Sequence, residues 1–254
     1  MPLRLGIMPF NAPVALLRTH QPLIQHLEKE LGRPIVVRSS SDYYTFVNQL
    51  LDGQFDIAIA GPHFASMAQT KGWVILVRYR ADLQPVLVVR EGGPISEIDD
   101  LRGKRIGLSS PLSMSSIGGV KWLLDQGLKM GSDFQLHEYP SHGAAIAAVT
   151  AGEVEAALTT HTPIRQVPED VRRQIRIMAT EIHMPHLMTL AATRLGTPEV
   201  ARVRAALDKF PSTPAGETFF RDTGYLGYAD VTASDLKALR PFVDLTLQMM
   251  RPIR

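Results

Sequence analysis

A serine-rich segment carries the clearest chemistry in this sequence. Ser109, Ser110, Ser113, Ser115 and Ser116 lie between an apolar strand expected at residues 106–108 and a helix that runs to about residue 126. The first turn of a helix has free N–H groups and a partial positive charge. Small hydroxyl side chains add donors and allow close approach, so the segment suits a phosphate-like anion without a lysine. The alternative is a polar loop in which Ser113 simply caps the helix.

Other polar turns occupy similar places after expected strands. Tyr43 and Tyr44 open a helix after Ser41 and Asp42, and their phenol groups are potential donors. At least one of these two tyrosines is expected to pack against the sheet instead. The segments at residues 61–63, 141–142 and 159–161 follow strands in the same way, which adds Pro62 as a candidate contact.

Four of the eight histidines fall on expected loops at strand ends, namely His63, His142, His161 and His186. A protonated imidazole would donate hydrogen bonds to an anion. Each of these rings could equally cap a helix or pack against neighbouring side chains. No HExxH pattern or close histidine pair with acidic support is present, so we predict no metal site and no cofactor.

The motifs of common enzymes are also missing. The sequence has no GxSxG elbow, no GK[ST] phosphate loop and no cysteine, and no carboxylate pair is marked out for acid–base work. Asp56 and Glu155 come just before strands, which is the end away from a ligand, so we expect structural roles for both. Met114 lies inside the serine-rich segment and is included among the candidate ligand-binding residues.

A short unit occurs twice, at residues 51–62 and 150–161. Each copy ends a helix and continues through a glycine, an acid, an apolar run and a polar turn. The glycine suits the left-handed end of a helix, and the apolar run suits a parallel strand covered on both faces. Ligands of α/β sheets bind beyond the carboxyl ends of the strands. The repeat therefore predicts two α/β lobes, although helix–glycine–strand joints occur in any α/β protein.

The hydrophobic pattern predicts the remaining elements. Strands are expected at residues 3–8, 35–37, 57–60, 73–79, 85–90, 106–108, 134–139, 156–159, 175–179 and 187–192. Helices are expected at residues 22–31, with Pro22 near the first turn, and at 43–51, 63–71, 117–126, 143–150, 198–210, 214–222 and 233–250. We predict a first lobe of residues 1–82 plus 188–254 and an inserted second lobe of residues 83–187. The two crossings between the lobes would form a hinge.

The composition narrows the class of protein. The chain has 254 residues, 45% hydrophobic and 20% charged, with a net charge of +2, which is ordinary for a soluble globular protein. No basic run is flanked by aromatic residues, so nucleic-acid binding is not predicted. No apolar stretch reaches the roughly 18 residues of a membrane span. No signal peptide is visible, which fits either a cytoplasmic protein or one whose targeting segment was removed.

Taken in order, the motifs resemble those of the phosphonate, phosphite and phosphate solute-binding proteins of ABC transporters. The resemblance rests on Gly53-x-x-Asp56-Ile57-Ala58 followed by Gly61-Pro62, on Leu101-x-Gly103-Lys104-Arg105 with the serine turn, and on His142-x-x-Ala145-x-x-Ala148-Val149-x-x-Gly152. It spans about residues 3–193. It implies the two-lobed type II periplasmic-binding-protein fold, an α/β fold in which each lobe is a mostly parallel sheet flanked by helices. The ligand would be clamped in a hinged cleft.

The resemblance also implies a ligand site. A tyrosine at the place of Tyr43 or Tyr44 would contact the ligand, Ser113, Ser115 and Ser116 would bind the phosphonate oxygens, and His142 would assist. Residues 83–85 stand where the family has a tyrosine, and neither residues 159–162 nor 183–186 supply a carboxylate for an ammonium group. An aminoalkylphosphonate is therefore not expected. A smaller oxyanion, or an anion with an aromatic or neutral tail, fits better.

We therefore predict a monomeric, non-enzymatic binding protein outside the cytoplasm that delivers a small anionic ligand to a membrane ABC permease. Two alternatives remain at this stage. The same fold could be the ligand-sensing domain of a signalling protein. It could also be a small biosynthetic enzyme of the thiamine-pyrimidine or menaquinone type, for which the histidine-rich turns would be the reason.

Overall fold

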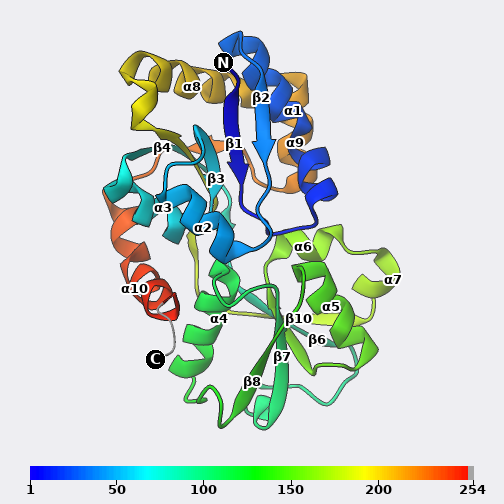
Figure 1. The fold of residues 1–254 in the computed structure, drawn as a ribbon. Coiled ribbons are helices and arrows are strands. Elements are labelled where there is room, and N and C mark those ends of the chain that lie inside the picture. Colours follow the sequence, from blue (N-terminus) through cyan, green and yellow to red (C-terminus); the bar gives the residue numbers. More distant parts are fainter. Residues whose placement is uncertain (251–254) are drawn as a thin grey trace. The chain divides into compact units, whose positions relative to one another are not determined.

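The computed structural model describes residues 1–250 (Figure 1). The chain forms two compact units. Unit 1 comprises residues 1–82 and 184–247, and unit 2 comprises residues 83–183 with residues 248–250. Where the chain passes between the units, β5 (Asp82–Leu83) and β11 (Met184–Pro185) form a two-stranded sheet. No helix among the described residues combines the length and the apolarity needed to cross a bilayer.

Unit 1 contains a six-stranded sheet in the order β13-β4-β12-β3-β1-β2. Its strands are β1 (Leu3–Ile7), β2 (Ile35–Arg38), β3 (Ile57–Ala60), β4 (Trp73–Tyr79), β12 (Met188–Ala192) and β13 (Tyr228–Ala229). β1 is parallel to β2 and β3, whereas β12 is antiparallel to both β3 and β4. The carboxyl ends of β1 to β4 therefore share one edge of the sheet, which is where ligands of such sheets bind.

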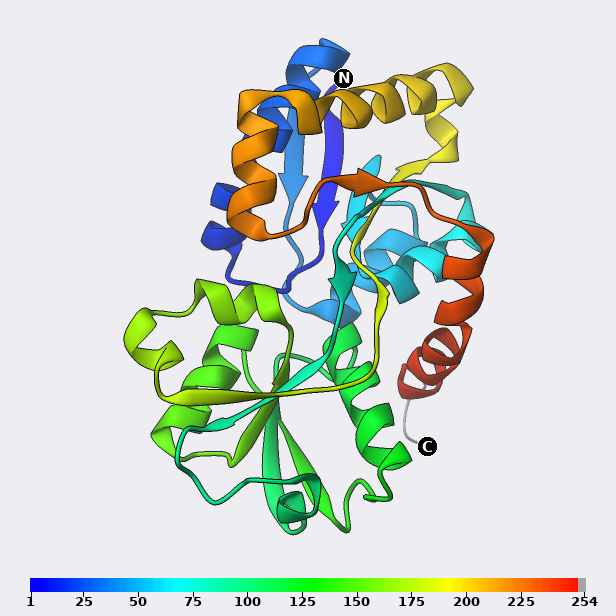
Figure 2. The same ribbon diagram turned by 180° about the vertical axis from the view of Figure 1, so that it is seen from behind.

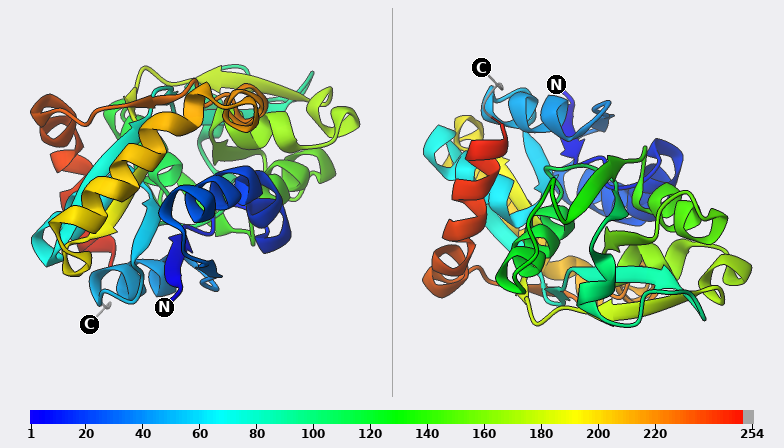
Figure 3. Two further views of the ribbon diagram at one scale, coloured as in Figure 1. Left: turned by 90° about the horizontal axis from the view of Figure 1, so that it is seen from above. Right: turned by 90° about the horizontal axis from the view of Figure 1, so that it is seen from below.

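Helices flank this sheet. They are α1 (Pro13–Leu31), α2 (Tyr43–Leu51), α3 (Pro62–Ala68), α8 (Thr197–Lys209), α9 (Pro214–Thr223) and α10 (Ala233–Met249), with 3₁₀ turns η1 (Gln69–Lys71), η3 (Thr193–Leu195) and η4 (Phe210–Ser212). α1 packs against α8 and α9, and the view from above shows α1 and α8 side by side (Figure 3). Seen from behind, α9 continues from the end of α8 through η4 (Figure 2).

The expected start of the first helix is wrong. α1 begins at Pro13, and Pro22 lies inside the helix rather than in its first turn. An internal proline removes one backbone hydrogen bond and crowds the preceding turn. The helix continues through it because Leu16, His20 and Leu23 form one buried stripe with the apolar residues that follow, and that burial outweighs the local cost.

Unit 2 contains a five-stranded sheet in the order β10-β6-β9-β7-β8. Its strands are β6 (Val86–Arg90), β7 (Lys104–Leu108), β8 (Phe134–Glu138), β9 (Ala156–Thr159) and β10 (Ile175–Ala179), and its helices are η2 (Ile98–Leu101), α4 (Met114–Asp125), α5 (His142–Ala151), α6 (His161–Gln166) and α7 (Glu169–Arg172). β7 is parallel to both β8 and β9. Leu87 and Leu158 belong to a core cluster with Trp122 of α4, whereas Val86 and Val88 belong to another with Ile146 of α5. The central strands are thus covered on both faces, as predicted.

The repeated unit has the expected structure in both places. Gly53 follows the last residues of α2 with a φ of 69°, and Gly152 ends α5 with a φ of 77°. Both angles lie in the left-handed region that favours glycine. The strands that follow, β3 and β9, each pair in parallel with a neighbour in their own sheet. In each copy, therefore, the strand ends in a polar turn at the carboxyl edge of its own sheet.

Candidate functional site

The serine-rich turn joins the carboxyl end of β7 to α4. Ser113 is the N-cap of α4: its Oγ accepts a hydrogen bond from the backbone N–H of Ser116 at 3.1 Å. The same oxygen lies 3.0 Å from Ser115 Oγ and 2.7 Å from Ser116 Oγ, and all three side chains are buried. The first intrahelical bond runs from Ile117 N–H to the Ser113 carbonyl. Met114 and Ser115 lie in the first turn of α4, where the backbone N–H groups have no intrahelical acceptor.

The electrostatics of this turn favour a negative charge. α4 has twelve residues, and its first turn holds no acidic side chain. The partial positive charge at its N-terminus is therefore not neutralised locally. Ser113 caps α4, as the alternative interpretation of the serine-rich segment predicted. It leaves the hydroxyl groups of Ser115 and Ser116 free to rotate toward another acceptor, because each is bonded only to another hydroxyl.

A second helix begins beside this turn. Ser141 caps α5 by accepting from Ala144 N–H at 3.1 Å, and His142 is the first residue of the helix. His142 Nε2 and Ser109 Oγ share a hydrogen bond of 3.1 Å, which ties the end of β7 to the start of α5. The first turn of α5 also lacks an acidic residue. Unit 2 thus brings two unneutralised helix N-termini and several hydroxyl groups to one edge of its sheet.

Burial changes the expected chemistry of the histidines. Burial lowers the pKa of His142 to about 4, and the nearby Leu158 carbonyl opposes this shift only in part. Burial lowers the pKa of His186 to about 3. For His161, burial and the neighbouring charge of Arg165 also lower the pKa. The protonated form, which could donate to an anion from both ring nitrogens, is therefore disfavoured for these residues, and the neutral rings of His142 and His186 each have a single N–H to donate.

His161 and Thr159 lie at the end of β9 and the start of α6. His161 Nε2 is 3.0 Å from Gln84 Oε1, and the Gln84 amide donates to the Thr180 carbonyl at 2.6 Å. The Thr159 hydroxyl is fully buried, and none of the described residues is its hydrogen-bond partner. Sequence reasoning did not single out Thr159 as a site residue. Its only signal was its position at the end of the second repeat.

The two tyrosines of α2 have different environments. Tyr43 is buried, with its ring centroid 6.4 Å from that of Phe64, whereas Tyr44 is 41% exposed. Asp42 caps α2 by accepting from Thr45 N–H at 2.7 Å, and hydrogen bonds from Ser41 and Thr45 lower the pKa of its carboxyl group. The N-terminus of α2 therefore already holds a negative charge. Tyr44 is the tyrosine that remains accessible to a ligand.

Pro62, His63 and His186 belong to packed parts of unit 1. Pro62 is the first residue of α3, so His63 lies inside a helix, in agreement with the helix expected from residue 63 and not with a place on the preceding loop. The His63 ring is fully buried with its centroid 4.0 Å from that of Phe64. His186 follows β11, and its Nδ1 accepts from Leu187 N–H at 2.8 Å. The His186 ring packs 4.9 Å from Tyr225, so both histidines have structural surroundings of their own.

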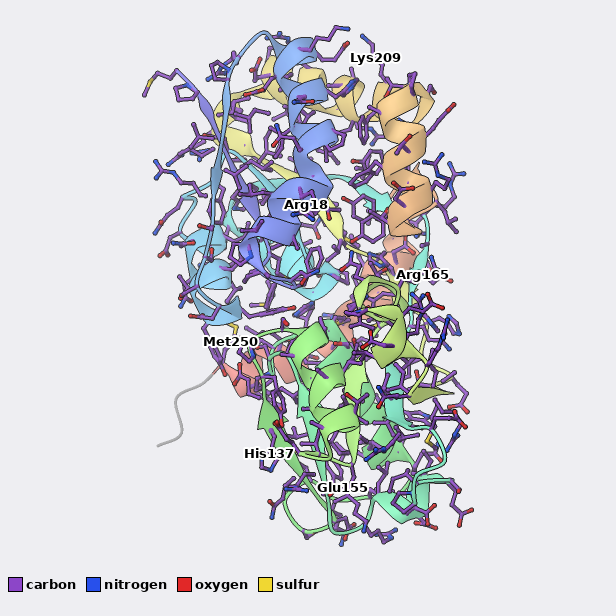
Figure 4. The ribbon with its side chains drawn as sticks, turned by 90° about the vertical axis from the view of Figure 1, so that its right-hand side faces the viewer. Arg18, His137, Glu155, Arg165, Lys209 and Met250 are labelled. Carbon is purple, nitrogen blue, oxygen red and sulfur yellow. The ribbon has the colours of Figure 1, made fainter. Side chains whose placement is uncertain are left out.

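The two acids that precede the repeated strands are structural, as expected. Asp56 forms ion pairs with Arg4 at 3.0 Å and Arg194 at 2.9 Å; burial opposes ionisation, but these contacts outweigh it and lower the pKa of the carboxyl group. Glu155 pairs with Arg105 at 2.8 Å. Figure 4 shows Glu155 and Arg165 at opposite ends of unit 2. Among the described residues, no group of three or more histidines and acids is placed to hold a metal ion.

Comparison with known proteins gives the family of this chain. The sequence profile of a family of periplasmic substrate-binding proteins of phosphonate ABC transporters matches residues 5–236. The chain belongs to this family. The family consists of solute-binding proteins, so the coarse function is capture of a small molecule for a membrane permease, and the family works outside the cytoplasm.

Solved structures show the same two-lobed fold. A binding-protein component of an ABC phosphonate transporter from Pseudomonas aeruginosa matches with a TM-score of 0.85 at 15% identity, covering 99% of this chain and 89% of that one. PhnD1 from Prochlorococcus marinus, in complex with methylphosphonate, matches with a TM-score of 0.82 at 15% identity, covering 97% and 98%. A Xanthomonas citri protein bound to a chloride ion matches with a TM-score of 0.79 at 18% identity, covering 98% of both chains.

Proposed function

We propose that this protein binds a small oxyanion of the phosphonate, phosphite or phosphate class and presents it to an ABC permease. The observation that supports this most directly is the start of α4. There the N–H groups of Met114 and Ser115 and the hydroxyl groups of Ser115 and Ser116 gather at a helix N-terminus without an acidic neighbour. An oxyanion would accept hydrogen bonds from these donors and interact favourably with the helix dipole.

The donors of this proposed site are neutral. Ser109 and His142 lie beside the turn, and burial keeps the His142 ring uncharged. A neutral imidazole would orient one N–H toward an anion or toward Ser109, and it would not add a formal charge. The attraction for the anion would then come from the ends of α4 and α5, which makes a small, fully desolvated oxyanion the best match.

We propose that unit 1 also contributes a residue to ligand binding. We propose that Tyr44 contacts the ligand, because it is the exposed tyrosine at the start of α2. Closure would take place at the two connections between the units, as expected for a domain joined by two crossings. His161 would lie at the margin of the site, with its ring held by Gln84. We propose that the protein acts as a monomer.

Calorimetric titration tests the proposal. Purified protein is titrated with phosphite, phosphate and methylphosphonate, and the double variant Ser115→Ala/Ser116→Ala is compared with the wild type. A hydrogen bond to a charged group contributes about 1.5–3 kcal/mol, so we expect a loss of affinity of at least about tenfold. Ser113 is left intact because it caps α4, and Ser96→Ala at an exposed position of unit 2 is the control. The absence of binding by the wild type to all three anions would refute the proposal.

A further inference from the structure

Unit 1 contains a polar pocket that the proposed anion site does not use. Its volume is about 390 Å³, at the lower end of the range of about 300–1,000 Å³ that is typical of small-molecule sites. Two arginines and two glutamines contribute to its lining, and no acidic side chain does. The lining residues are Arg4, Arg38, Ser39, Gln49, Gln54 and Phe55. All of them belong to unit 1, so the pocket is complete within that unit.

The two arginines come from neighbouring strands and lie on one face of the sheet. β1 and β2 are parallel, with Arg4 beside Val36 and Gly6 beside Arg38. Because side chains alternate between the two faces of a sheet, Arg4, Gly6 and Arg38 share a face. The Cα atoms of the two arginines are then roughly 8 Å apart, since they differ by two residues along the strands and by one strand spacing.

Gly6 leaves room for an aromatic ring beside the arginines. A Cβ atom added to Gly6 would lie 2.6 Å from Phe55 Cδ2, so the Phe55 ring rests directly on the backbone of β1. Phe55 is only 1% exposed, which makes it a fixed floor. On another side, the Ser40 hydroxyl donates to Gln49 Oε1 at 2.6 Å, and this bond leaves the amide hydrogens of Gln49 as donors. The floor and one wall of the pocket are therefore already formed by the fold.

An existing ion pair keeps the two guanidinium groups apart. Arg4 donates to Asp56 through Nε at 3.0 Å and through Nη2 at 3.2 Å, and these two bonds leave Nη1 for another acceptor. Asp56 directly precedes β3, which lies on the opposite side of β1 from β2, so the Arg4 side chain is drawn away from Arg38. Asp56 also pairs with Arg194 at 2.9 Å. Two arginines thus share a single acid, and the charge beside the pocket stays positive.

Arg38 supplies a second positive charge. Its side chain is exposed, and among residues 1–250 no acid forms an ion pair with it. A guanidinium group binds a carboxylate through two parallel hydrogen bonds. Two positive groups that are held apart, with amide and hydroxyl donors beside them, match an anion that is charged at both ends better than an anion with one charged end.

We infer that this pocket binds a small linear dicarboxylate, with one carboxylate on Arg38 and the other on Nη1 of Arg4. The amide groups of Gln49 and Gln54 would donate to the remaining carboxylate oxygens. The chain between the two carboxylates would lie over the Phe55 ring. The pocket and the serine turn belong to different units, so this inference does not depend on the proposed function.

Calorimetric titration of the whole chain with glutarate tests the inference. Butyrate is the comparison ligand, because it has a similar chain and only one carboxylate. The loss of a hydrogen-bonded charged group should make butyrate bind at least about tenfold more weakly than glutarate. The double variant Ser115→Ala/Ser116→Ala should bind glutarate as the wild type does, since the serine turn belongs to unit 2.

Substitutions assign the binding to the pocket. Arg38→Gln removes the exposed guanidinium group, and the near-isosteric Gln54→Glu places a negative charge at an exposed position of the lining. Each should weaken glutarate binding at least about tenfold. The controls Arg18→Gln and Gln21→Glu make the same changes at exposed positions of α1 outside the pocket, and Arg18 is labelled in Figure 4. Equal urea midpoints for these variants and the wild type verify that all of them fold.

The outcomes separate this inference from the proposed function. Glutarate binding that is lost in both pocket variants and kept in both controls supports the site. The inference is overturned if the wild type does not bind glutarate, if both pocket variants still bind it, or if butyrate binds equally well. Loss of glutarate binding in the serine double variant would also overturn it, because glutarate would then occupy the proposed anion site. Failure of phosphite, phosphate and methylphosphonate to bind would instead refute only the proposed function.

Discussion

The buried histidine of the candidate site makes the stability of unit 2 sensitive to acid. His142 is 5% exposed, and burial lowers its pKa to about 4, compared with about 6.5 for an unfolded histidine. Between these two values the unfolded chain binds a proton that the folded chain does not. The contribution of His142 to the free energy of unfolding is therefore fully present above the pKa of the unfolded histidine. It is lost as the pH falls from about 6.5 toward 4.

The size of this effect follows from the two pKa values. At pH 5 an unfolded histidine is almost fully protonated, whereas His142 in the folded protein is mostly neutral. Protonation of the unfolded chain changes the folding equilibrium constant by about 1.5 powers of ten between pH 8 and pH 5. This change lowers the free energy of unfolding by about 2 kcal/mol relative to pH 8. His142→Gln lacks the titrating group. The free-energy difference between wild type and this variant should therefore change by about 2 kcal/mol between pH 8 and pH 5.

The assay must report on unit 2 alone. The chain has two tryptophans, of which Trp122 lies in α4 of unit 2 and Trp73 in β4 of unit 1. Labelling with 5-fluorotryptophan gives one ¹⁹F signal for each unit, and urea unfolding is followed at pH 8 and pH 5 for wild type and His142→Gln. His137→Gln is the control, because His137 is an exposed residue of β8 in the same unit (Figure 4).

Two results would contradict the reasoning. The first is an unfolding free-energy difference between wild type and His142→Gln that is the same at pH 8 and pH 5. The second is an NMR titration in which the His142 ring protonates near pH 6.5 in the folded protein. Either would mean that the ring reaches water or a negative partner in the folded state, and the proposed neutral donor would have to be abandoned.

Two further predictions concern the supports of the site. Ser113→Ala removes the N-cap of α4 and should lower the free energy of unfolding of unit 2 by about 0.5–2 kcal/mol in urea titrations, whereas Ser113→Asp should largely restore it. An unchanged urea midpoint for Ser113→Ala would show that the cap is dispensable. Gly119→Ala should cost about 1–3 kcal/mol, because the added Cβ would lie 2.4 Å from Leu158 Cδ2 of β9. A thermal midpoint equal to that of wild type would show that α4 and the sheet shift apart freely.

Local sequence signals predicted many elements well. Helix α2 and strands β3, β4 and β9 have the predicted bounds, because each combines an apolar run with a glycine or a capping residue close by. The first half of α1 was not predicted. Both Pro13 and Pro22 are suited to the first turn of a helix, and the start at Pro13 is favoured by tertiary packing rather than by local sequence. α6, α7 and β13 were also not expected, because elements of six, four and two residues are too short to show a period.

The amino-acid sequence by itself determined the two-part α/β class, the place of the serine turn at the start of a helix, and the family, because these depend on residues that are close together in the chain. Only the tertiary structure decided that Ser109 bonds to His142, 33 positions away, that Tyr43 is buried while Tyr44 is exposed, and that His142 is neutral. These properties depend on which distant segments cover a side chain and exclude water from it. Burial of that kind is a sum over the whole fold, and no short stretch of sequence contains it.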